Sequence, residues 1–170
     1  MDIYVGKFPV CYGQFYFLSE THWDGDLEEC FSKQVNGLCG VSFPGVVFFI
    51  TGLHTGNISL NLNLYDSEPP SDNQAEEIVE ASINVLSSSL FLESWGGEVK
   101  KELGLTPGTY RIRYSAINFQ KAEELGKFDE GDIELYSVKL WPAPYSSDEI
   151  IKVKSKSAQY WHDEVAKRQL

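Results

Sequence analysis

The sequence has only three cysteines, and their number and spacing argue against a disulfide-stapled secreted fold. Cys11, Cys30 and Cys39 are odd in number and form no Cys-x-x-Cys motif, so we expect three buried or half-buried thiols. No apolar run reaches the roughly 18 residues of a membrane helix, and no basic region followed by an apolar one opens the chain. These absences predict a cytoplasmic protein without a membrane segment.

The chain also lacks the motifs of the commoner enzyme and metal sites. Its three histidines, His22, His54 and His162, have no second histidine at the spacing of a zinc motif. No Gly-x-Ser-x-Gly, P-loop or dinucleotide-binding glycine motif is present. The carboxylates of residues 24–29 lack the order of a calcium loop and favour surface or helix-capping roles. We therefore expect no catalytic residue, no metal and no cofactor.

Basic residues are scarce in the first part of the chain. Residues 1–99 hold 14 Asp and Glu against two lysines, whereas residues 100–170 hold 11 acids against 12 Lys and Arg. The net charge of −11 therefore comes entirely from residues 1–99. Such a chain repels nucleic acid and anionic membranes and can attract a basic protein, although high negative charge also simply favours solubility.

Alternation of apolar and polar residues with period two is the dominant pattern of the sequence. Strands are predicted, in chain order, at residues 12–18, 46–50, 58–65, 76–94, 105–116 and 132–141. Residues 76–94 are expected to contain one or two strands, although 74–81 is also compatible with a helical turn. The glycines of residues 51–57 predict a hairpin between the two strands that flank them.

Six or more short strands with few helices predict a mostly β protein, an antiparallel β-sandwich with a short C-terminal helix. Helical periodicity is confined to residues 25–35 and to the polar, basic tail, which we expect to pack against the body. One domain is expected over residues 1–170, with a strand core at about 8–145 and a helical extension at about 146–170.

One acidic segment is a candidate binding surface. Residues 65–80, YDSEPPSDNQAEEIVE, hold six carboxylates and no basic residue. They are either a solvated loop or a negative face aimed at a basic partner. Carboxylates steer a basic protein to its site, and a neighbouring aromatic can anchor it. The residues predicted to contact a partner are Tyr65, Asp66, Glu68, Asp72, Glu76, Glu77 and Glu80.

Several motifs follow one another in a distinctive order. YGQFYF at 12–17 is followed by Trp23 in an acidic segment, by GVSF at 40–43, by a strand pair, and by LGLTPGTYRIRY at 103–114 before a last strand. This order, over roughly residues 8–141, resembles the competence protein J family, small bacterial inhibitors that bind a DNA-entry nuclease. The chain also resembles related uncharacterised bacterial proteins that end in a strand, WPAP (141–144) and a tail containing YWH (160–162). The extension IIKVKSKSAQYWHDE at 150–164 departs from the shorter inhibitors. The resemblance implies a β fold and a nuclease as partner.

We therefore expect a non-enzymatic, acidic inhibitor or immunity-type protein that neutralises a basic nuclease or toxin without binding nucleic acid itself. A carbohydrate- or small-ligand-binding sandwich is the alternative. In that case Trp23 or Trp95 would stack on the ligand, and Asn61 and Asn63 would hydrogen-bond it. An enzyme built from scattered histidines and carboxylates is a third. The sequence leaves the oligomeric state open.

Overall fold

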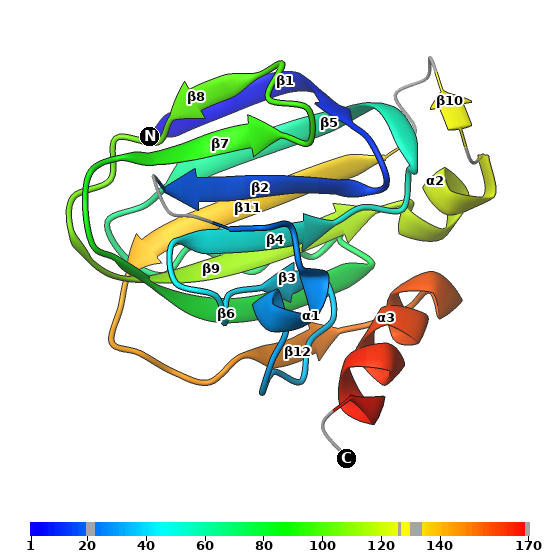
Figure 1. Ribbon diagram of the computed structural model, residues 1–170. Helices are drawn as coiled ribbons and strands as arrows, with labels where there is room; N and C mark the ends of the chain where they lie inside the picture. The colour runs from blue at the N-terminus through cyan, green and yellow to red at the C-terminus, as the bar shows by residue number, and fades with distance from the viewer. Residues whose placement is uncertain (20–22, 126, 130–133, 169–170) are drawn as a thin grey trace.

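The computed structural model describes residues 1–19, 23–125, 127–129 and 134–168, which form two β-sheets packed face to face (Figure 1). Sheet A contains β1 (Asp2–Val10), β5 (Thr55–Leu64), β6 (Glu77–Val85), β9 (Gly108–Ile117), β10 (Lys127–Asp129), β11 (Leu135–Pro142) and β12 (Glu149–Lys152). Sheet B contains β2 (Gln14–Ser19), β3 (Cys39–Gly40), β4 (Val46–Ile50), β7 (Leu90–Ser94) and β8 (Lys100–Glu102). The helices are α1 (Leu27–Cys30), α2 (Phe119–Leu125) and α3 (Lys156–Lys167).

The strand order explains how the chain closes the sandwich. Sheet A runs β1-β5-β11-β9-β6-β12, with β10 beside β5, and sheet B runs β3-β4-β2-β7-β8. Neighbouring strands are antiparallel, except that β10 and β11 run parallel to β5. The predicted mostly β sandwich with a short C-terminal helix is confirmed, and sheet A is mixed because of these two pairings.

The core lies between the sheets and is rich in aromatic rings. Ile112 of β9 and Val138 of β11 are fully buried, as the period-two pattern predicts. In sheet B, Phe15 stacks on Phe49 with ring centroids 4.6 Å apart. Phe49 meets Tyr114 of sheet A edge to face at 5.1 Å. These aromatic contacts join the two layers at the centre of the sandwich.

The segment between β4 and β5 crosses from one sheet to the other, so the hairpin predicted there is wrong. The two strands belong to different sheets and do not pair. The Tyr114 hydroxyl donates to the Ile50 carbonyl at 2.8 Å, and the Gly52 N–H donates to the Tyr136 hydroxyl oxygen at 2.7 Å. A Cβ on Gly52 would lie 2.1 Å from the carbonyl oxygen of Phe119. Glycine is needed here because the chain passes directly against the start of α2.

Five strands and one helix were not expected from the sequence, namely β1, β3, β8, β10 and β12, and α2. β1 was not predicted, because residues 5–7 are all exposed and interrupt the alternation. β12 was not predicted because all four of its residues are exposed, so no apolar face marks it. Residues 77–81 form part of β6 and not a helical turn, and the helix expected at 25–35 is the four-residue α1.

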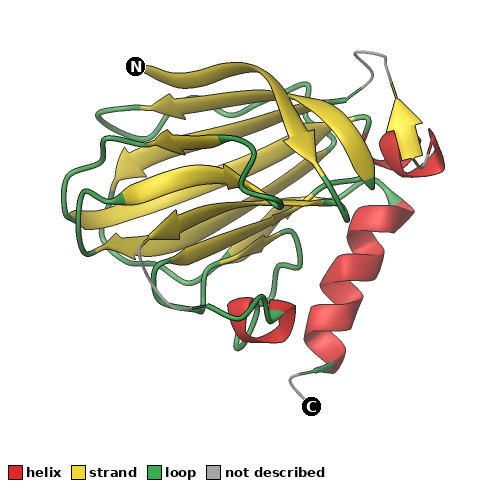
Figure 2. Cartoon of the chain, turned by 45° about the horizontal axis from the view of Figure 1, so that its top comes forward, coloured by secondary structure: helices red, strands yellow, loops and turns green. Residues whose placement is uncertain are grey.

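The C-terminal helix packs against the body, as expected for the tail. Figure 2 shows α3 as the long helix beside the sheets. The face of α3 that packs against the body buries the side chains of Ala158, His162 and Val165. The backbone N–H of Gly37 donates to Nδ1 of His162 at 2.9 Å, which fixes this helix to the loop before β3. Burial lowers the pKa of His162 to about 4, although the negative charges of Asp163 and Asp148 act to raise it.

Substitution of Gly52 by alanine tests the close approach at the crossing segment. Gly52→Ala should lower the free energy of unfolding by about 2 kcal/mol, because the new Cβ overlaps a backbone carbonyl that cannot easily move. Urea denaturation measures the change. Gly96→Ala is the control, since its Cβ would come no closer than 3.8 Å to another residue. Equal stability of the two variants would contradict the packing described here.

The buried imidazole predicts a specific pH dependence of stability. Between pH 6.5 and about 4 the unfolded chain takes up a proton on His162 that the folded chain does not. Stability should therefore be complete above pH 6.5 and fall by up to ~3 kcal/mol as the pH drops to 4. His162→Gln should flatten this part of the curve, while carboxylate titrations common to both proteins cancel in the difference. Parallel curves for the two proteins would refute the assignment.

Candidate functional site

The acidic segment 65–80 lies against the outer face of sheet A. It leaves β5 at one end of the sandwich and reaches β6 after passing over β11 and β9, which separate those strands. The carbonyl of Pro69 accepts a hydrogen bond from Arg113 at 2.9 Å, and Asp72 accepts one from the Ser115 hydroxyl at 3.3 Å. Lys139 donates to the Pro70 carbonyl at 3.4 Å. The segment is thus held by side chains of β9 and β11 that point away from the core.

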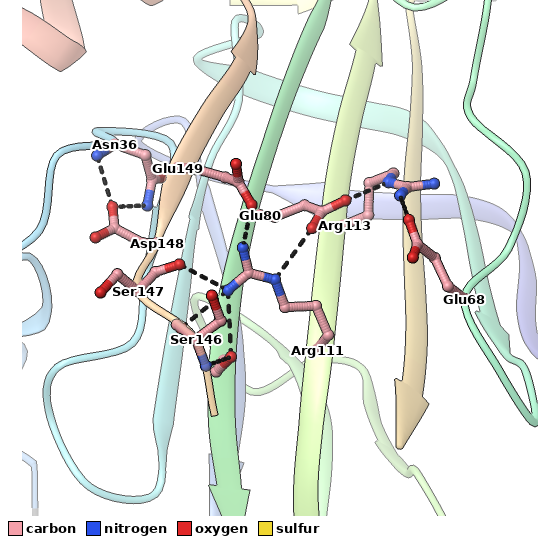
Figure 3. Close-up of polar contacts among 10 residues, drawn as sticks. Asn36, Glu68, Glu80, Arg111, Arg113, Ser146, Ser147, Asp148 and Glu149 are labelled. Carbon is pink, nitrogen blue, oxygen red and sulfur yellow. Dashed lines mark hydrogen bonds and ion pairs between the residues drawn. The ribbon is translucent and has the colours of Figure 1, made fainter. Parts of the chain in front are cut away.

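Two arginines of β9 are buried beneath this cover. Arg111 and Arg113 are only 4% and 6% exposed, although they face away from the hydrophobic core. The Glu80 carboxylate lies between them: one oxygen is 3.0 Å from Nε of Arg111 and the other 2.6 Å from Nε of Arg113 (Figure 3). Glu149 pairs with Arg111 at 2.7 Å, and Glu68 pairs with Arg113 at 2.9 Å. Five charges therefore alternate in sign across the sheet.

The register of the sheet places three of these groups, Arg113, Glu80 and Glu149, in one row. Glu80 of β6 stands directly opposite Arg113 of β9 on one side and Glu149 of β12 on the other. Two carboxylates facing each other across strands would repel, and the guanidinium of Arg111 bridges them. Arg111 also donates to the Ser147 carbonyl at 2.8 Å. Each buried cation is thus matched by carboxylates and carbonyls, the condition under which a buried ion pair is tolerated.

Other members of the acidic segment also have partners within the chain. Glu77 is fully buried and accepts the backbone N–H groups of Lys154 and Ser155 at 3.1 and 2.8 Å, next to the start of α3. Burial raises the pKa of Glu77, and these hydrogen bonds oppose the shift. Glu76 accepts from the Asn118 N–H at 3.0 Å and lies 3.3 Å from the Lys154 ammonium.

The seven predicted contact residues lie in β6 and in the segment before it, and they differ in exposure. Glu77 and Glu80 are buried, Tyr65, Asp72 and Glu76 are partly buried, and Asp66 and Glu68 are exposed. Among the described residues, Asp66 has no ion pair or hydrogen bond through its side chain. Contact of this segment with a partner stays a prediction, and its exposed members are the ones that a partner could reach.

A second group of carboxylates is more exposed than the acidic segment. Asp24, Asp26, Glu28 and Glu29 lie in and before α1, and all four are exposed. Asp26 caps the helix by accepting the Glu28 N–H at 2.7 Å, in agreement with the capping role expected from the sequence. The only ion pair of these four with a described residue joins Glu28 to Arg168 at 3.4 Å. We call these four residues the α1 carboxylates.

The α1 carboxylates affect their surroundings electrostatically. Burial, with added repulsion from Asp26, Glu29 and Asp24, raises the pKa of the Cys30 thiol to about 12. Burial likewise raises the pKa of Cys39. Both cysteines are buried and free, and Cys11 is half-buried and free, as predicted. Thiols held in the protonated form are poor nucleophiles, which fits structural roles.

Trp95 and Asn63, two residues of the ligand-binding alternative, do not lie together. Trp23 packs against Tyr16 at 5.2 Å, and Trp95 is half exposed and contacts Tyr12 at 5.0 Å. Asn63 donates to Asp2 at 2.6 Å. Asp2 begins β1 whereas Tyr12 follows the end of that strand, so Trp95 and Asn63 lie toward opposite ends of the sandwich.

A search of the described residues for metal and membrane features gives two results. No group of three or more His, Cys, Asp and Glu side chains among them is arranged to hold a metal ion. None of the helices in the described ranges combines the length and the apolar character that crossing a bilayer requires.

Comparison with known proteins identifies the fold. No protein-family model and no curated protein matches the sequence. The structure of ComJ from Bacillus subtilis, an inhibitor of the DNA degrading activity of NucA, is similar with a TM-score of 0.59 at 14% identity, over 84% of this chain and 98% of that chain. A structure described as crocagin biosynthetic gene J is similar with a TM-score of 0.50 at 15% identity, over 83% of this chain and 98% of that chain. The chain therefore has a ComJ-like fold.

Substitution of Glu80 tests the arginine pair. Glu80→Gln should lower the free energy of unfolding by about 3–5 kcal/mol, because two buried guanidinium groups lose the carboxylate between them. Glu68→Gln is the matched control and should cost less than about 1 kcal/mol, since the Glu68 side chain is 69% exposed. Urea denaturation compares the two variants, and a cost at Glu80 no larger than at Glu68 would show that the network contributes little.

Proposed function

We propose that this protein is a non-enzymatic inhibitor that binds and neutralises a basic protein, a nuclease or a nuclease-type toxin. The observation that carries the proposal is the ComJ-like fold, since ComJ inhibits the DNA degrading activity of NucA. The net charge of −11 supports it independently. A nuclease binds phosphates through basic residues, and a negative protein surface is complementary to them.

The α1 carboxylates are the part of the surface best suited to this contact. Most carboxylates of the segment 65–80 are matched by bases of the same chain, whereas Asp24 and Glu29 have no ion pair with a described residue. Asp66 and Glu68 are the exposed members of the acidic segment and are the ones that a partner could reach. In this proposal, the contact predicted for residues 65–80 is made by these two residues.

An aromatic residue lies next to the α1 carboxylates. Trp23 is half-buried, and its indole N–H donates to the Asp26 carbonyl at 3.3 Å. Exposed charges mainly raise the rate of association, whereas large aromatic side chains contribute most of the affinity at protein interfaces. Trp23 takes in this proposal the anchoring role that the sequence suggested for Tyr65.

A capture assay with charge variants tests the proposal. Basic proteins retained by the immobilised chain at low salt are released at high salt and assayed for degradation of plasmid DNA, with and without added chain. We expect nuclease activity in the released fraction and its suppression by the chain. Combined Asp24→Asn, Glu28→Gln and Glu29→Gln should raise the concentration needed for suppression about tenfold and flatten its salt dependence.

Two further variants serve as controls for the capture assay. Asp66→Asn with Glu68→Gln tests the acidic segment and should have a smaller effect than the α1 substitutions. Glu98→Gln with Glu102→Gln removes two exposed charges around β8 and should leave inhibition unchanged. A released fraction without nuclease activity, or activity that the chain does not suppress, would overturn the inhibitor proposal.

A further inference from the structure

A cleft of about 600 Å³ lies between the start of β4 in sheet B and the end of β6 in sheet A. Val46, Ile83 and Leu90 belong to its lining and are buried. Leu86 and Tyr145 also line it, yet they are 81% and 71% exposed. Large apolar side chains left in water beside a mainly apolar cleft of this size are typical of a small-molecule site.

One cation of the cleft is not used by the fold. Lys33 is the one basic residue among the described residues that line the cleft. Its side chain forms no ion pair or hydrogen bond with any residue that the structure describes. Its φ of 61° lies in the left-handed region, where glycine is favoured and a lysine is strained. The turn after α1 therefore holds a lysine where glycine would cost less, and the ammonium group remains available to a ligand.

The acid among the described residues that line the cleft is held by hydrogen bonds within the fold. Asp148 lines the cleft, and a single carboxylate oxygen accepts three hydrogen bonds. One comes from the Val35 N–H at 2.9 Å. The other two come from the backbone and side-chain amides of Asn36, each at 2.8 Å (Figure 3). Hydrogen bonds of this kind stabilise a carboxylate in its charged form, so Asp148 has a structural partner and Lys33 does not.

We propose that this cleft binds an amphipathic monocarboxylate. The carboxylate pairs with the ammonium of Lys33, and the apolar body lies against Val46, Ile83 and Leu90. The ligand also covers Leu86 and Tyr145 at the mouth. The cleft is a separate site, and its binding does not depend on the proposed inhibitor function.

Three eight-carbon probes with different head groups test the proposal: octanoate, octan-1-ol and octylamine. Their binding to the full chain is followed by ligand-observed NMR titration. Octanoate should bind about fivefold more tightly than octan-1-ol, the size expected for one partly exposed ion pair. Octylamine should bind more weakly than either. Equal binding of octanoate and octan-1-ol, or preference for octylamine, would overturn the role of Lys33.

Variants distinguish the effect of the Lys33 charge on binding from an effect on the fold. Lys33→Gly should reduce octanoate affinity to that of octan-1-ol and leave octan-1-ol binding unchanged. Its melting temperature should not fall, because glycine adopts positive φ without strain. Leu86→Asp should weaken both probes. Lys101→Ala removes an exposed charge on β8, at the opposite edge of sheet B from β3, and should change nothing. Failure of all three probes to bind at millimolar concentration would overturn the site itself.

Discussion

The Glu80 carboxylate, held between two buried arginines, is the interaction on which the outer face of sheet A depends. Arg111 and Arg113 belong to a central strand, and two segments from distant parts of the sequence cover them. Such cover is possible only if each guanidinium finds carboxylates and carbonyls in place of water. Residues 68–70 and 146–149 supply them, so the charge pattern of the network determines where these segments lie.

This arrangement gives the uneven charge distribution of the sequence a structural meaning. Acids from the first part of the chain are matched by bases from the second part: Glu80 by Arg111 and Arg113, and Glu76 by Lys154. Much of the apparent negative face is thus neutralised within the molecule. The α1 carboxylates, which lie on a different element from the acidic segment, are four acids within residues 24–29 that remain exposed.

The sequence predicted the faces of the strands better than their partners. Period-two alternation correctly placed Ile112 and Val138 inside, because the orientation of a side chain on a strand is a local property. Pairing is not local, so the sequence could not show that β4 and β5 belong to different sheets. β12 was not predicted, because its four residues are all exposed and do not alternate between a buried and an exposed face.

The candidate site was harder to predict for the same reason. The alternation of Arg111 and Arg113 with apolar residues indicated that they face away from the core, but their burial depends on segments more than 30 residues away. The sequence of an acidic run does not show whether the run contacts another protein or a distant strand of its own chain. The exposed carboxylates of residues 24–29 were visible in the sequence, where they indicated only surface or capping roles.

Hydrogen exchange of the backbone amides, in the free chain and in complex with the captured nuclease, tests this division of roles most directly. The amides of Tyr65 and Glu76 donate to the carbonyls of Leu140 and Ala116 and should exchange slowly in the free chain. Amides of residues 65–80 should change little on binding, because the segment is already held against sheet A. Amides around α1 should become protected in the complex. Rapid exchange of the Tyr65 and Glu76 amides in the free chain, with protection of residues 65–76 on binding, would contradict the account and would identify the acidic segment as a free binding face.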